Sequence, residues 1–243
     1  MLDVKEISKR FSGLVAVDSV SMRALQGTIT ALLGPNGAGK TTTFAMIAGF
    51  LKPDSGSVAF CGESITGKTP EEIARIGMVR TFQITQPFAG LSVVENIQVG
   101  AFMRERNRRL AEIKAREVGT RLGLDRLLDT PAAGLTVAAR KRLEVARVLA
   151  TDPQLILLDE VMAGLNPTEI NETVRMVKTV RDTGITIVLI EHVMQAVAEL
   201  AEDTYVLAEG RLIARGTPRE IANNPKVIES YLGQGASKRI RHA

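Results

Sequence analysis

The chain has 243 residues, of which 45% are hydrophobic and 24% charged, and this composition is typical of a soluble globular protein with a substantial buried core. No apolar run approaches the roughly 18 residues of a membrane span, and the N-terminus lacks the apolar region of a secretory signal. The single cysteine, Cys61, excludes an intrachain disulfide and is expected to be a small buried side chain. We therefore expect a cytoplasmic protein that cannot cross a bilayer alone.

The net charge of +4 raises the question of an anionic partner. Only 4% of the residues are aromatic and tryptophan is absent, so the stacking side chains of nucleic-acid-binding proteins are missing, and we expect no nucleic-acid partner. Basic residues gather between residues 104 and 121 and in a basic C-terminal tail, residues 234–243. A solvated helix face and a frayed tail explain these clusters better than a specific anionic surface such as lipid headgroups.

Two short strands are predicted at residues 2–7 and 15–22, joined by a turn at residues 12–13, because apolar and polar residues partly alternate there. They are expected to form a sheet edge beside the next strand, residues 29–33. Phe11 lies at their junction, where its ring could stack on a purine base. A core phenylalanine is the other interpretation, and position alone does not decide between the two.

The strand at residues 29–33 leads into a glycine-rich turn and then into a helix predicted at residues 41–50. This is the setting of the P-loop pattern G-x-x-x-x-G-K-[ST], whose fixed positions are Gly34, Gly39, Lys40 and Thr41. Backbone N–H groups in such a turn point at an anion, and the helix adds its positive end. Lys40 is expected to reach the β- and γ-phosphates of ATP, and the Thr41 hydroxyl to hold Mg²⁺. The other positions expected to bind the nucleotide are Pro35, Asn36, Gly37, Ala38 and Thr42.

The next segment predicts a turn at residues 52–56, a strand at residues 57–61 and a short helix that starts at Pro70. Another strand, residues 78–82, ends in Gln83. A polar residue that leaves a buried strand is a candidate site residue, although a loop glutamine is the commoner explanation.

Residues 88–150 have helical spacing and no strand pattern, with helix starts expected at Ser92 and Thr136. After this helical insert, strands and helices alternate again, and the strands at residues 155–158 and 185–190 are continuously apolar, as strands buried on both faces are. We therefore predict an α/β fold with a doubly wound core. Residues 1–87 and 151–233 would form this core, residues 88–150 a helical subdomain, and residues 234–243 a separate tail.

Two carboxylates follow the apolar strand at residues 155–158, where folds of this class place ligands. Asp159 is expected to hold the Mg²⁺ shell, and Glu160 to act as the general base that activates the attacking water. His192 follows the strand that ends at residue 190 and would leave the same sheet edge, where its neutral imidazole could bind the γ-phosphate.

The ordered set of these motifs resembles the ATPase subunits of ABC transporters across nearly the whole chain. The resemblance implies a P-loop NTPase (RecA-like) core with an N-terminal antiparallel β edge and an α-helical ABC subdomain. It also implies ATP and Mg²⁺ as cofactors, and head-to-tail pairing with a second cassette. The roles that it implies are an aromatic A-loop at Phe11, a metal-binding and catalytic Q-loop at Gln83, a Walker B acid at Asp159, a catalytic glutamate at Glu160, a D-loop at residues 163–167, a switch histidine at His192 and a signature motif containing Thr136.

Within this family, the segments at residues 80–83, 163–167, 191–192 and 216–233 look like those of branched-chain amino acid importers. Urea and amide importers share much of this pattern, and lipopolysaccharide-export ATPases share some of it. The resemblance implies integral-membrane permease subunits as partners, a solute-binding protein as an indirect partner, and a location on the inner face of the cell membrane.

The chain departs from the family pattern in two segments. Where the family has L-S-G-G-Q, residues 135–139 read Leu-Thr-Val-Ala-Ala, which keeps the Thr136 hydroxyl but loses both glycines and the glutamine. Val137 adds a β-branched side chain that resists a positive φ. Val161 replaces the usual proline after the catalytic glutamate and is expected to alter the D-loop backbone. We hypothesise that the second cassette is a different chain with an intact signature; a symmetric ATPase is the alternative.

Two functions outside transport compete with this interpretation. A soluble ABC ATPase that acts on ribosomes or DNA usually has tandem cassettes or long coiled coils, and neither is present here. A P-loop phosphotransferase would need an acceptor site, for which no motif is found, and the combination of Glu160 and His192 argues against it.

Overall fold

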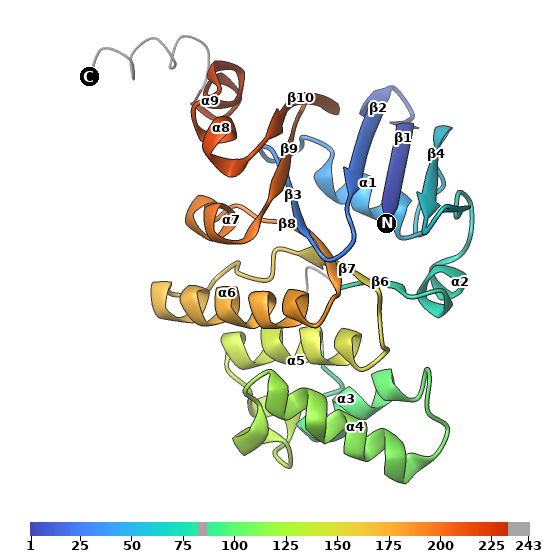
Figure 1. Cartoon of the computed structure of the whole chain (residues 1–243), viewed down its shortest axis with the longest axis vertical. Helices are drawn as coiled ribbons and strands as arrows, with labels where there is room; N and C mark the ends of the chain where they lie inside the picture. The colour runs from blue at the N-terminus through green and yellow to red at the C-terminus, as the bar shows by residue number, and fades with distance from the viewer. Residues whose placement is uncertain (82–86, 233–243) are drawn as a thin grey trace.

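The computed structural model describes residues 1–81 and 87–232. Within these residues the centre of the fold is a six-stranded sheet (Figure 1), whose strands lie in the order β10-β9-β3-β8-β7-β6. Its strands are β3 (Ile29–Leu33), β6 (Met78–Arg80), β7 (Leu155–Asp159), β8 (Thr186–Ile190), β9 (Asp203–Ala208) and β10 (Arg211–Gly216). All pair in parallel except β10, which forms an antiparallel hairpin with β9. The alternation of parallel strands and helices confirms the predicted α/β fold.

The central strands divide their side chains between two hydrophobic cores. Along β7, Leu155 and Leu157 enter one core, and Ile156 and Leu158 enter the other. Helices α6 (Pro167–Asp182) and α7 (Met194–Leu200) cover one face of the sheet, and α1 (Lys40–Ile47) covers the other. Because both faces are covered, these strands read as continuous apolar runs in the sequence.

The N-terminal strands form a sheet of their own, in the order β2-β1-β4-β5. Its strands are β1 (Leu2–Phe11), β2 (Leu14–Ala24), β4 (Ser55–Phe60) and β5 (Glu63–Ser64). The antiparallel pair was predicted, but not its place: β1 and β2 pair with each other, and β1 with β4, rather than with β3. The apolar face of this sheet packs with α1 in one core, so burial of that face decides its position.

Cys61 contradicts its expected burial. It is exposed and lies in the turn between β4 and β5 with a positive φ of 51°. The strand was predicted to include residue 61, but it ends at Phe60. Cys61 therefore lies in a turn, where its side chain faces solvent although it is apolar.

Three helices form the helical subdomain, which lies below the sheet in Figure 1: α3 (Val93–Ala101), α4 (Arg108–Arg121) and α5 (Val137–Leu149). The predicted starts of α3 and α5 are confirmed, because Ser92 and Thr136 cap them. In the basic cluster, Arg116 pairs with Asp129, as expected of a solvated helix face. The other α-helices of the described residues are α2 (Pro70–Arg75), α8 (Pro218–Ala222) and α9 (Pro225–Leu232). Among the helices of residues 1–81 and 87–232, none has the length and apolar character of a membrane span.

Candidate functional site

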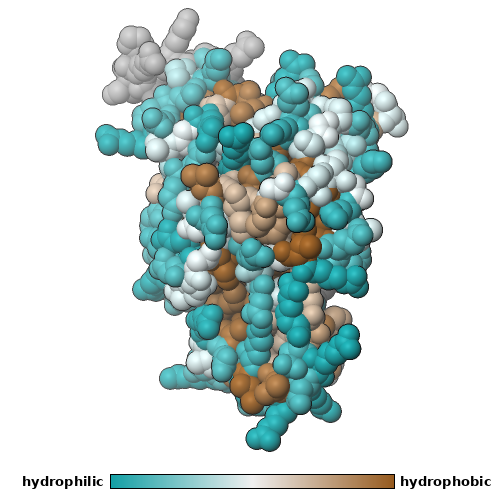
Figure 2. Space-filling model, turned by 45° about the vertical axis from the view of Figure 1, so that its right-hand side comes forward, coloured by the Kyte–Doolittle hydropathy of each residue, from teal (hydrophilic) through white to brown (hydrophobic). Residues whose placement is uncertain are grey.

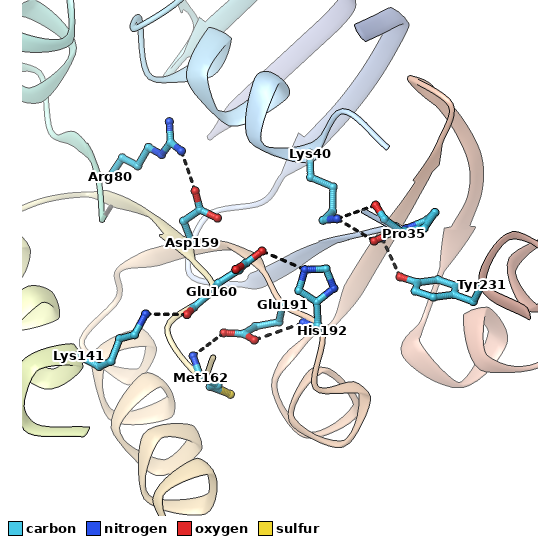
Figure 3. A network of polar contacts seen from close by, with 11 residues as sticks. Pro35, Lys40, Arg80, Lys141, Asp159, Glu160, Met162, Glu191, His192 and Tyr231 are labelled. Carbon is cyan, nitrogen blue, oxygen red and sulfur yellow. Dashed lines mark hydrogen bonds and ion pairs between the residues drawn. The ribbon is translucent and has the colours of Figure 1, made fainter. Parts of the chain in front are cut away.

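The glycine-rich turn at residues 34–39 joins β3 to α1 at the carboxyl end of β3. Figure 3 shows Pro35 of this turn and Lys40, the first residue of α1. The two outer glycines of the turn have positive φ angles, 149° at Gly34 and 97° at Gly39. A Cβ atom at Gly34 would lie 2.2 Å from the Leu207 carbonyl oxygen, and one at Gly39 would lie 2.5 Å from that of Ala16. Both positions therefore require glycine. No side chain caps α1, so the first N–H groups of this helix are available to an anion.

Lys40 lies folded back over this turn. Its ammonium donates hydrogen bonds to the carbonyl oxygens of Gly34 at 2.8 Å and Pro35 at 3.0 Å, and the residue is only 6% exposed. Burial lowers the pKa of Lys40, and the nearby charges of Glu160 and Asp159 partly offset this effect. The structure thus brings the P-loop lysine within electrostatic range of both predicted acidic residues.

Asp159 ends β7 and is completely buried. Its Oδ2 accepts a hydrogen bond from Arg80 Nη2 at 2.7 Å, and its backbone N–H donates to Thr81 Oγ1 at 3.0 Å. Its other oxygen, Oδ1, is buried and has no hydrogen-bond partner within the described residues. A free carboxylate oxygen at this position suits a hard cation such as Mg²⁺, which binds through one or two carboxylates and retains several water ligands.

Glu160 and His192 lie side by side, with His192 Nε2 3.0 Å from Glu160 Oε1. Glu160 has a positive φ of 50°, an unfavourable conformation for a residue with a Cβ. Backbone contacts hold it there: its N–H donates to the Ile190 carbonyl at 3.0 Å, and its carbonyl accepts from Lys141 Nζ at 3.0 Å and from the Ala163 N–H at 3.2 Å. Backbone strain held in this way is common at functional sites.

Glu191 connects the histidine to the loop after Glu160. Its Oε1 accepts from the Met162 N–H at 2.9 Å and its Oε2 from the His192 N–H at 3.3 Å. Glu191 is 2% exposed, and this burial raises its pKa to about 7. The two loops that follow β7 and β8 are therefore tied together by a single buried carboxyl group.

The altered signature forms the start of α5. Thr136 caps this helix by accepting from the Ala139 N–H at 3.2 Å, and Val137 is 53% exposed. Thr136 has an ordinary φ of −63°, and none of residues 136–139 has a positive φ. No positive φ is therefore required of Val137, and its β-branched side chain causes no backbone strain, because this backbone starts a regular helix. The added side chains remain at the helix N-terminus, where Val137 is exposed and Ala138 and Ala139 are half-buried.

The other predicted site residues are placed as follows. Phe11 ends β1 and is 46% exposed, so it is not a core residue. Thr41 is exposed and Thr42 half-buried in the first turn of α1. Gln83 lies outside the described residues. Its roles in catalysis and metal binding remain predictions.

Sequence reasoning did not single out three side chains of this site: Arg80, Lys141 and Tyr231. Tyr231, on α9, accepts a hydrogen bond from the Gly34 N–H at 2.8 Å (Figure 3). Arg80 follows the apolar residues Met78 and Val79 in a predicted strand, and a charged residue at such a position is the signal that would have found it. Lys141 lies between Arg140 and Arg142, so no sequence pattern distinguishes it.

Comparison with known proteins places the chain in a family. Residues 17–163 match the family model described as ABC transporter, and residues 211–237 match that of the branched-chain amino acid ATP-binding cassette transporter. The chain is 37% identical to the probable branched-chain amino acid transport ATP-binding protein LivG of Archaeoglobus fulgidus, with 96% of this chain and 95% of the relative covered. It is 38% identical to the high-affinity LivG protein of Salmonella typhimurium, with 96% and 98% covered.

A solved structure agrees with these relatives. The crystal structure of a nucleotide-free ATP-binding cassette from an ABC transporter superposes with a TM-score of 0.89 at 33% identity. The match covers 96% of this chain and 99% of that cassette. The chain thus resembles the family both in its sequence and in the arrangement of the P-loop, the strand that ends in acidic residues and the helical subdomain. The chain belongs to the ABC transporter family and is an ATP-binding cassette that hydrolyses ATP.

Proposed function

We propose that this chain is the ATP-hydrolysing subunit that energises a membrane permease for branched-chain amino acids. The observation that carries the proposal is similarity to the LivG proteins over nearly the full length of both chains, together with the match of residues 211–237 to the branched-chain family model. Urea and amide import and lipopolysaccharide export are the alternatives with related sequences. The chain would lie on the inner face of the membrane, bound to its permease.

In this proposal Lys40 leaves the Gly34 and Pro35 carbonyls and binds the phosphates of ATP. Asp159 and the Thr41 hydroxyl would hold Mg²⁺, which would neutralise phosphate charge when bound. Glu160 accepts the proton of the attacking water, and His192 orients the Glu160 carboxylate through their 3.0 Å contact. Phe11 stacks on the adenine ring with its exposed face.

A cleft of about 980 Å³ between the core and the helical subdomain would receive the permease. Apolar side chains line it, and Figure 2, which turns this side forward, shows such side chains where the upper and lower parts of the molecule meet. Three of them are large and exposed: Phe50 at 50%, Phe88 at 47% and Val99 at 41%. Exposed apolar surface of this kind marks a protein interface. A cytoplasmic segment of the permease with an apolar face is the proposed occupant.

A charge placed in this cleft tests the assignment. We expect Val99→Glu to remove the chain from the membrane fraction and to abolish uptake of labelled leucine, because a carboxylate would be buried against the permease. Ile113→Glu is the matched control, since Ile113 is 46% exposed on α4 of the same subdomain but does not line the cleft. Loss of leucine uptake in both variants would contradict docking in the cleft. Normal leucine uptake in cells lacking the chain would exclude the branched-chain assignment.

The second cassette is proposed to be a different chain. Val137 and Ala138 project bulk from the N-terminus of α5, where the family brings glycine N–H groups close to the γ-phosphate held by the opposite chain. A homodimer would carry this obstacle at both sites. In a heterodimer, an intact partner signature would complete the site on this chain's P-loop. A solute-binding protein would deliver the amino acid to the permease.

Restoring the family signature tests this asymmetry. Val137→Gly, Ala138→Gly and Ala139→Gln together are expected to raise the ATPase rate of the isolated chain tenfold or more at high protein concentration. This corresponds to about 1.4 kcal/mol of recovered transition-state contact. The rate is measured by phosphate release. A robust rate in the unaltered chain with no increase on restoration would favour the symmetric ATPase.

A further inference from the structure

None of the roles in ATP binding and hydrolysis given above belongs to Arg80, yet its side chain holds the buried carboxylate of Asp159. Its side chain is 10% exposed at the end of β6, beside β7, and its Nη2 lies 2.7 Å from Oδ2 of Asp159. Asp159 is completely buried, and a buried carboxylate is costly unless a cation or hydrogen bonds compensate its charge. Arg80 supplies both a positive charge and a hydrogen bond.

The guanidinium is itself held in place. Its central carbon lies 6.0 Å from the ring centre of Phe44 and 5.9 Å from that of Phe50, so two aromatic rings flank the cation. The backbone of Asp159 is also fixed, because its N–H donates a hydrogen bond to the hydroxyl of Thr81, the residue that follows Arg80. Arg80 and Thr81 therefore fix Asp159 from the same strand end, one at the carboxylate and one at the backbone.

This arrangement leaves the two carboxylate oxygens unequal. Oδ2 is occupied by Arg80, whereas Oδ1 has no hydrogen-bond partner within residues 1–81 and 87–232. Rotation of the carboxylate about its Cβ–Cγ bond would break the contact with Arg80. The hydrogen bond to Oδ2 thus determines the direction in which Oδ1 points.

We propose that Arg80 is a positioning residue for the metal site: it holds Oδ2 of Asp159 so that Oδ1 is presented to the Mg²⁺ of bound Mg²⁺·ATP. This inference rests on the proposed Mg²⁺ role of Asp159. Arg80 also lines the cleft proposed for the permease. A protein segment in that cleft would therefore touch the residue that orients the metal-binding acid, which gives the permease a direct route to the ATP site.

The test measures the metal-dependent gain in ATP affinity, defined for each variant as the ratio of the Kd in EDTA to the Kd in Mn²⁺. Calorimetry supplies both values, and the ratio cancels any change in ATP affinity that does not depend on metal. We expect Arg80→Met, which keeps an apolar stem but loses the donor, to lower this gain about tenfold. Arg80→Lys should restore most of it, because the contact uses a single nitrogen.

Arg215→Met is the matched control. Arg215 also pairs with an aspartate, Asp203 at 2.9 Å, and lies over an aromatic ring, Tyr205 at 4.9 Å, but it is on β10 outside the site. Its metal-dependent gain should equal that of the unaltered chain. An unchanged or larger gain in Arg80→Met would overturn the positioning role. The absence of any gain in the unaltered chain would instead overturn the Mg²⁺ site itself, and the inference with it.

A measurement on the unaltered chain covers the case in which Arg80→Met does not fold. In ¹⁵N NMR spectra, the Nη–H signals of Arg80, assigned by their loss in Arg80→Lys, should remain sharp and restricted when Mg²⁺·ATP binds. If these signals merged into one averaged signal on addition of Mg²⁺·ATP, as they do for a freely rotating guanidinium, Arg80 would have released Asp159. This result would overturn the proposal.

Discussion

Replacing Glu160 by glutamine is expected to slow ATP hydrolysis by a factor of roughly 10² to 10⁴ while ATP binding is retained. The amide keeps the shape of the side chain and can still contact His192, which lies 3.0 Å from the carboxylate, but it cannot accept the proton of the attacking water. Single-turnover hydrolysis in the assembled transporter gives the rate, and calorimetry gives the affinity.

Glu199→Gln is the control for this change. Glu199 lies on α7, where it accepts a hydrogen bond from Gln195 Nε2 at 3.5 Å and lies 3.9 Å from Lys178 Nζ, so the same loss of one carboxylate occurs away from the site. We expect it to hydrolyse ATP at the rate of the unaltered chain. A Glu160→Gln transporter that turned over at that rate would show that another group is the base.

The sequence contained enough to predict the large sheet and the P-loop. Strands β7 and β8 are buried on both faces, so their runs of apolar residues are unambiguous. Helices α3 and α5 begin at the predicted capping side chains, Ser92 and Thr136, whose chemistry is local. Features that depend on neighbours in sequence were therefore accessible before the structure.

Features that depend on distant contacts were not. The N-terminal strands have the alternation of any half-buried sheet, and only their packing with α1 shows that they form a separate sheet. Arg80 and Asp159 are 79 positions apart, and their contact follows from the pairing of β6 with β7. Likewise, the hydrogen bond from Gly34 to Tyr231 joins residues 197 positions apart. No local pattern encodes such pairs, so the residues that position the site were missed while the residues of the motifs were found.

Replacing Lys40 by alanine is expected to weaken ATP binding by roughly 10- to 150-fold. A charge-assisted hydrogen bond in a partly desolvated site contributes about 1.5–3 kcal/mol. Lys40 meets this condition, because it is 6% exposed and burial lowers its pKa, so little water competes for its ammonium group. Calorimetric titration with ATP measures the loss.

The structure also explains why this loss should concern binding rather than folding. Lys40 donates hydrogen bonds to the carbonyl oxygens of Gly34 and Pro35 and to no carboxylate among the described residues. Its removal therefore leaves no buried carboxylate of these residues without its closest cation, because Asp159 keeps Arg80 at 2.7 Å. Lys178→Ala, on the exposed side of α6, controls for the loss of one positive charge. We expect it to bind ATP as the unaltered chain does. If Lys40→Ala bound ATP equally well while keeping its thermal transition, residues 34–41 would not be the phosphate site, and the anion would have to bind at another position of the sheet edge.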